Sequence, residues 1–93
     1  MPRGEILRRI AEALTELQEE SGREATKISE DMKPIGDLDG FDSHAGLELA
    51  CALEQKLDIE IPLDENLCVD DEKRRARTVK EIVERVIELQ KGK

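Results

Sequence analysis

Ser43 is the residue whose type and position most clearly suggest chemistry. It follows Asp42 where a polar, glycine-containing stretch gives way to an apolar segment. Because aspartate is a favoured N-cap, Ser43 is expected in the first turn of a helix with its hydroxyl exposed. An exposed serine of this kind suits covalent modification and presentation to other proteins, and it does not suit catalysis by the serine itself.

The charge distribution indicates the kind of partner. The net charge is −8, and residues 29–72 hold 14 acidic and two basic residues, whereas the two ends of the chain are mildly basic. This acidic middle argues against nucleic acid or an anionic membrane as the main partner. It favours a docking surface for positively charged proteins, or else simply a solvated surface that aids solubility.

A catalytic triad or a metal site is disfavoured. Asp42, Ser43 and His44 are the residue types of a hydrolase triad, but neighbours on a helix point about 100° apart and cannot form the relay. Asp37, Asp39 and Glu48 match positions 1, 3 and 12 of a calcium loop, but positions 5 and 6 are wrong for one. We therefore expect no catalytic residue and no calcium-loop ligand, and loose binding of a divalent cation to these carboxylates stays an open alternative.

A further metal alternative comes from the cysteines. His44, Cys51 and Cys68 supply three ligand types without a fourth, so a metal site there is a weak hypothesis. Both cysteines stand among apolar residues and lack zinc-type or redox-type spacing, so we expect them to be small buried core residues.

The apolar spacing predicts an all-α fold. Three main helices are expected over residues 5–20, 43–57 and 78–90, with a short helix over 64–69. The last helix begins with the capping box Thr78-Val79-Lys80-Glu81, and residues 58–62 are extended before Pro62. A long loop over 22–41 joins the first two main helices without a regular element. The prediction is a small four-helix bundle, a single domain over residues 1–93, with an aliphatic core.

Helix 43–57 is expected to be buried on several sides. Leu47, Leu49 and Cys51 widen its apolar arc beyond a single stripe, while Glu48 lies on the opposite face. The chain has no apolar run long enough to span a membrane and no apolar signal region near residue 1, so a cytoplasmic protein is expected.

Residues 35–90 resemble acyl carrier proteins in residue type, spacing and helix order, and residues 1–34 do so more weakly. The matching motifs are Asp42-Ser43, Leu47-Glu48-Leu49, Ala52-Leu53-Glu54 and Leu57-Asp58-Ile59-Glu60-Ile61-Pro62. The resemblance implies that Ser43 carries a 4′-phosphopantetheine arm derived from coenzyme A, and that acyl groups are bound to the thiol of this arm as thioesters. A phosphate there would meet free backbone N–H groups and the positive end of the helix dipole.

The resemblance also implies partners. A phosphopantetheinyl transferase (a holo-carrier synthase) would attach the arm, and acyl-loading enzymes, acyltransferases or synthases of fatty-acid, lipid or polyketide biosynthesis would dock through basic surfaces. The chain itself would be a monomeric carrier and not an enzyme. The residues expected to face these partners are Asp39, Asp42, His44, Glu48, Glu54, Asp58 and Glu60.

Three departures from the family pattern point to a specialised carrier. His44 replaces the leucine that usually follows the serine, Gly46 weakens the first turns of the helix, and residues 73–77 add a basic insert. The insert is expected to pair with Asp70, Asp71 and Glu72, or else to bind an anion. Two alternatives remain open, a carrier of aminoacyl or peptidyl groups and an unmodified, acidic interaction module.

Overall fold

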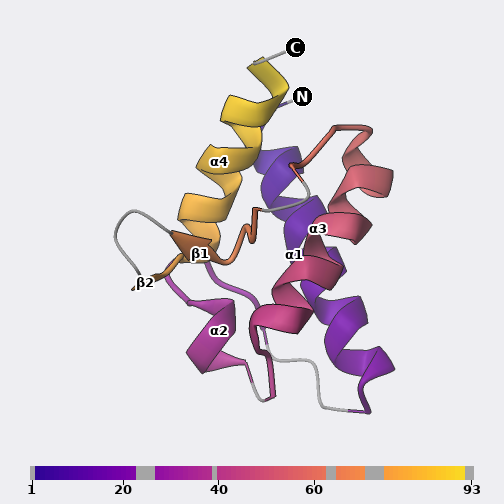
Figure 1. Cartoon of the computed structure of the whole chain (residues 1–93), viewed down its shortest axis with the longest axis vertical. Coiled ribbons are helices and arrows are strands. Elements are labelled where there is room, and N and C mark those ends of the chain that lie inside the picture. Colours follow the sequence, from indigo (N-terminus) through magenta and orange to yellow (C-terminus); the bar gives the residue numbers. More distant parts are fainter. Residues whose placement is uncertain (1, 23–26, 39, 63–64, 71–74, 92–93) are drawn as a thin grey trace.

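The helices account for most of the described chain. The computed structural model describes residues 2–22, 27–38, 40–62, 65–70 and 75–91. Within them lie four helices and one antiparallel pair of strands (Figure 1). The helices are α1 (Arg3–Glu20), α2 (Pro34–Asp37), α3 (Ser43–Leu57) and α4 (Val79–Lys91), and the strands are β1 (Val69–Asp70) and β2 (Arg75–Ala76). In this sheet Val69 pairs with Ala76 and Asp70 with Arg75.

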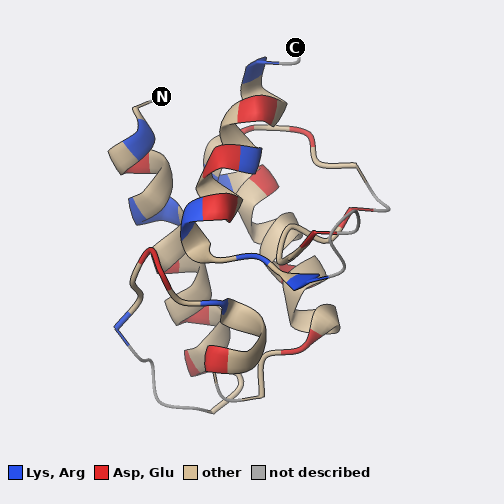
Figure 2. Cartoon of the chain, turned by 90° about the vertical axis from the view of Figure 1, so that its left-hand side faces the viewer, with Lys and Arg blue, Asp and Glu red and all other residues tan. Residues whose placement is uncertain are grey.

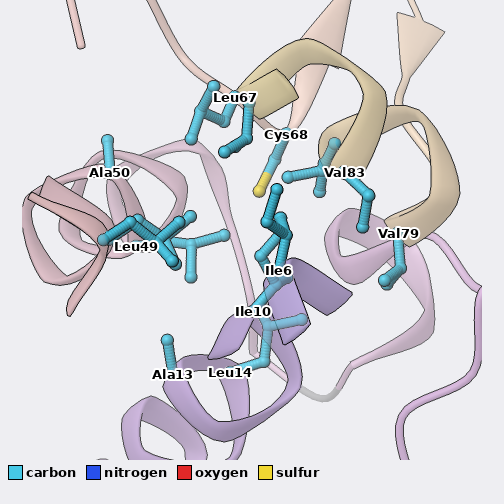
Figure 3. Close-up of a cluster of buried hydrophobic side chains, with 14 of the residues drawn as sticks. Ile6, Ile10, Ala13, Leu14, Leu49, Ala50, Leu67, Cys68, Val79 and Val83 are labelled. Carbon is cyan, nitrogen blue, oxygen red and sulfur yellow. The ribbon is translucent and has the colours of Figure 1, made fainter. Parts of the chain in front are cut away.

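Helix α1 organises the core because it packs against both α3 and α4. Ile6, Ile10 and Leu14 recur every four residues along α1 and are fully buried. Figure 3 shows them between Leu49 of α3 on one side and Val79 of α4 on the other. The core is aliphatic, as expected, apart from the buried Phe41 and Cys68.

The three main helices agree with the sequence prediction to within two residues at each end. Residues next to each helix set where it begins, since Asp42 caps α3 and the predicted capping box starts α4. The Thr78 N–H donates to Glu81 Oε1 at 3.0 Å, and the Glu81 N–H donates to Thr78 Oγ1 at 3.2 Å. None of the helices in the described ranges is both long and apolar enough to cross a lipid bilayer.

The loop over 22–41 contains one element that the sequence analysis did not predict. Pro34–Asp37 forms the short helical turn α2. The N–H of Lys33, the residue before this turn, donates to Asp37 Oδ2 at 2.7 Å. The same loop is tied to α4, because the Val79 and Lys80 N–H groups donate to the carbonyls of Met32 and Glu30 at 2.8 and 3.0 Å. These bonds satisfy first-turn donors of α4 and fix the path towards Ser43.

The predicted short helix over 64–69 is wrong for the part that the structure describes. Residues 67 and 68 form a turn and Val69 enters β1, while residue 64 lies outside the described chain. The Arg77 N–H donates to the Cys68 carbonyl at 2.8 Å. The Val69 N–H closes a single turn by donating to the Asn66 carbonyl at 3.2 Å, and the other backbone partners of this segment come from residues 75–77 rather than from a continuing helix.

Candidate functional site

Ser43 is exposed and is the first residue of α3. The preceding Asp42 has an extended backbone, and its Oδ1 accepts a hydrogen bond from the Ala45 N–H at 3.0 Å. The Asp42 carbonyl accepts from the Gly46 N–H at 3.1 Å, which closes the first helical turn. The serine hydroxyl thus stands at the surface on a capped helix end, as the sequence predicted.

An open arc runs along α3 from Ser43. We use this name for the exposed residues Ser43, His44, Leu47, Glu48, Cys51 and Gln55. The buried side of α3 is a narrower stripe, made of Gly46, Leu49, Ala50, Leu53 and Leu57. The prediction that α3 is buried on several sides is therefore wrong at Leu47 and Cys51, which are exposed and lie outside the buried stripe.

Leu47 is a candidate contact residue that the sequence analysis missed. It is the large hydrophobic side chain that remains exposed in the described chain, at 43%, and it lies one helical turn after Ser43. The sequence does indicate that Leu47 is exposed, because Leu47 lies outside the i, i+3, i+4, i+7 pattern of the buried stripe. Because this apolar side chain is exposed one turn from an exposed serine, it is a candidate contact for a protein partner.

The predicted docking residues divide into those on the open arc and those beyond it. On the arc, His44 Nε2 and Glu48 Oε1 lie 3.1 Å apart, and both side chains are more than half exposed. Asp42, Asp58 and Glu60 are exposed, and Glu54 is half-buried. Asp39 lies outside the described residues.

The charge of α3 differs from that of α4. Figure 2 shows acidic and basic residues alternating along α4, whereas Lys56 is the single lysine or arginine of α3. Lys56 pairs with Glu16 of α1 at 3.1 Å. Since this pairing offsets the basic charge of α3, the open arc presents net negative charge to an approaching protein.

The rival sites are not assembled within the described residues. The Asp42 carboxylate caps α3 and His44 faces Glu48, so no serine–histidine–aspartate relay forms. The Asp37 carboxylate, which holds position 1 of the calcium-loop pattern, instead accepts a hydrogen bond from the Lys33 N–H. The described residues contain no group of three histidine, cysteine or carboxylate side chains that could hold a metal ion.

The two cysteines have different environments. Cys51 is exposed on the open arc, so the prediction of a buried residue is wrong there. Cys68 is fully buried, and burial raises the pKa of its thiol to about 12. The Cys68 thiol is therefore protonated at neutral pH and belongs to the same core cluster as Ile6 (Figure 3).

The described part of the basic insert takes part in ion pairs with α4 and with the loop before β1. Arg75 binds Glu81 with an N–O distance of 2.7 Å, and Arg77 lies 3.6 Å from Glu65. Glu65 also accepts two hydrogen bonds from Arg85, each at 2.6 Å. Of the expected partners Asp70, Asp71 and Glu72, the last two lie outside the described residues, and Asp70 lies opposite Arg75 in the pairing of β1 with β2. Arg75 and Arg77 therefore help to hold the fold together.

Comparison of the chain with protein-family models, with curated proteins and with solved structures finds no match. The functional conclusion therefore depends on the residues and their geometry.

Proposed function

We propose that this chain is an acyl carrier protein modified on Ser43. The observation that carries the proposal is the placement of this exposed serine at the capped start of α3, at one end of the open arc. The residue types and spacing from Asp42 to Pro62 support the same conclusion. The four helices would then form a small carrier-type bundle in which a turn and β1 take the place of the short third helix.

The residues around Ser43 fit a phosphodiester-linked arm. The Ser43 oxygen would bond to the phosphorus that bears pantetheine, the diphosphate bond of coenzyme A would break, and adenosine 3′,5′-bisphosphate would leave. The serine proton would pass to the transferase or to solvent. The positive end of the helix dipole favours a phosphate at this position, while the Ala45 N–H of the first turn is already bonded to Asp42 Oδ1. The arm supplies a thiol that holds acyl groups as thioesters.

The open arc suits docking to basic enzymes. Glu48 offers an exposed carboxylate, Leu47 offers apolar surface, and Asp58 and Glu60 extend the acidic surface beyond the end of α3. Complementary charge accelerates encounter, and an apolar residue near the centre of a contact supplies affinity. In this proposal the chain works in the cytoplasm as a monomeric partner of a phosphopantetheinyl transferase and of acyl-transferring enzymes.

The proposal is tested by incubating the protein with coenzyme A, Mg²⁺ and a broad-specificity phosphopantetheinyl transferase. We expect the intact mass to rise by one phosphopantetheine and fragmentation to locate it on Ser43. An unchanged mass would refute the carrier and support an unmodified acidic interaction module, for which His44 beside the serine is the favouring feature. Loading with acyl or aminoacyl donors would then distinguish the two kinds of carrier.

Replacing Leu47 by alanine is expected to lower kcat/KM of the transferase for this protein by about tenfold. The loss corresponds to the apolar surface that leucine would bury in the complex, roughly 1.5 kcal/mol. Stability should change little, because Leu47 is exposed and alanine is a good helix former.

Glu84→Ala is the control for Leu47→Ala, since Glu84 is exposed on α4 and lies outside the open arc. Its transfer kinetics should equal those of the wild type. Equal kinetics for Leu47→Ala and Glu84→Ala would exclude Leu47 from the contact.

A further inference from the structure

Asn66 makes a contact that links the start of α3 to the loop before β1. Its Nδ2 donates to the carbonyl oxygen of Ser43 at 2.9 Å, and its Oδ1 accepts from the N–H of Cys68 at 2.9 Å. One amide side chain therefore uses both of its polar ends to join two backbones separated by more than 20 residues. The first of these backbones belongs to the proposed site of modification.

Gly46 is the residue that leaves room for Asn66. A Cβ atom built on Gly46 would overlap Oδ1 of Asn66 and lie 2.9 Å from its Cγ and Nδ2. Gly46 has no left-handed backbone requirement, since it lies within α3 and is absent from the positive-φ residues. The cost of a glycine in a helix is thus offset by the close approach of the Asn66 side chain.

The loop that carries Asn66 is itself anchored. Arg77 donates to the Leu67 carbonyl at 3.3 Å, and Glu65 is bound by Arg85 of α4. Leu67 and Cys68 are fully buried, and Figure 3 shows them at the core between α3 and α4. Because both neighbours of Asn66 are held, its amide is a fixed support for the first turn of α3.

We propose that Asn66 is a positioning residue for Ser43, and that a glycine is required at position 46 because a larger residue would displace the Asn66 side chain. This inference rests on the proposed carrier function. The Ser43 carbonyl is the acceptor that pairs with the Leu47 N–H in the first helical turn, and Asn66 supplies a second donor to that carbonyl. The helix end therefore opens less often, and the serine spends more time in the geometry that a transferase binds.

Two variants separate the bond to Ser43 from the bond to Cys68. Asn66→Asp keeps the size and the acceptor for Cys68 but faces the Ser43 carbonyl with an oxygen, whereas Asn66→Ala removes both bonds. In both variants we expect hydrogen exchange of the Leu47 amide to accelerate roughly five- to tenfold relative to buried amides of α1. If Asn66→Asp exchanges like the wild type at Leu47, the support of Ser43 is refuted.

Thr78→Ala is the matched control, because it removes the cap of α4 at a comparable cost without touching Asn66. It should not change the ratio of Leu47 exchange to α1 exchange. If the Asn66 variants change this ratio no more than Thr78→Ala does, Asn66 is merely structural and the inference fails.

The role of Gly46 is tested by a double-mutant cycle. Gly46→Ala should accelerate Leu47 exchange as Asn66→Ala does, because the added methyl displaces the amide. The double variant Gly46→Ala/Asn66→Ala should exchange no faster than Asn66→Ala alone, since the support is already lost. Additive effects would refute the assignment of Gly46.

Transfer kinetics supply a readout that global destabilisation would not produce. With folded protein in all samples, Asn66→Asp should raise KM for the carrier and leave kcat unchanged, because only the competent fraction of free protein falls. Since helix ends fray readily, with the first turn of the wild type open about a quarter of the time, the rise reaches about threefold. Unchanged KM would refute the positioning role. A wild type that gains no mass would refute the carrier function, whereas the exchange ratios would still decide whether Asn66 supports the first turn.

Discussion

Ser43→Ala is expected to gain no mass with coenzyme A and a phosphopantetheinyl transferase under conditions that convert the wild type completely. The variant lacks the only atom that could form the phosphodiester at the start of α3. Folding should be retained, because the Ser43 side chain is exposed and Asp42 provides the cap. Intact-mass spectrometry measures the effect directly, and far-UV circular dichroism verifies the fold.

The two other serines provide matched controls. Ser29 is exposed in a loop, and the Ser21 hydroxyl donates to the Leu17 carbonyl at the end of α1. Ser29→Ala and Ser21→Ala should be modified at the wild-type rate, since neither serine begins a helix. Modification of Ser43→Ala, or loss of modification in either control, would place the attachment elsewhere and overturn the assignment.

Glu65→Gln is expected to lower the free energy of unfolding at pH 7 by about 2 kcal/mol. Glu65 is 15% exposed and binds the guanidinium groups of Arg85 and Arg77. Removing its charge leaves Arg77, which is also 15% exposed, without this partner. The expected cost lies between that of a surface pair and that of a fully buried one. It is a large share of the stability of a domain this size.

The same carboxylate should contribute a pH dependence. Hydrogen bonds from Arg85, together with the charges of Arg85 and Arg77, hold the pKa of Glu65 below its ordinary value of 4.5 despite partial burial. A lowered pKa in the folded state stabilises the protein above the unfolded-state pKa, and this contribution is lost as pH falls through the folded-state pKa. The difference between wild type and Glu65→Gln should therefore shrink below about pH 4.5.

Urea unfolding followed by circular dichroism at pH 7 and at lower pH tests both expectations, because the chain has no Trp or Tyr for fluorescence. Glu84→Gln is the control, since Glu84 is exposed on α4 next to Arg85. It should change stability by less than about 0.5 kcal/mol. A Glu65→Gln effect as small as that of Glu84→Gln, or one that grows at low pH, would contradict the ion-pair account.

The connection between α3 and α4 shows where sequence-based prediction failed. Residues 64–69 were predicted to be helical from scattered apolar positions, but β1 pairs with β2 and the Arg77 N–H binds the Cys68 carbonyl. These partners lie several residues further along the chain, so no short window contains the information that selects a strand over a helix.

The prediction of which residues of α3 are buried failed for a related reason. Leu47 and Cys51 were assigned to the buried side from residue type, yet both are exposed. An apolar residue is buried only where another element covers it, and the buried stripe of α3 contains no residue of the open arc. This arrangement leaves Ser43 and Leu47 accessible together.

The sequence alone determined the three long helices, the capped position of Ser43 and the acidic character of residues 29–72, because caps, apolar periodicity and charge act over a few neighbouring residues. The tertiary structure decided that Asn66 meets Ser43 and Gly46, that Glu65 lies between Arg77 and Arg85, and that Leu47 stays exposed. These contacts join residues distant in the chain, and their geometry depends on how the helices pack around a common core.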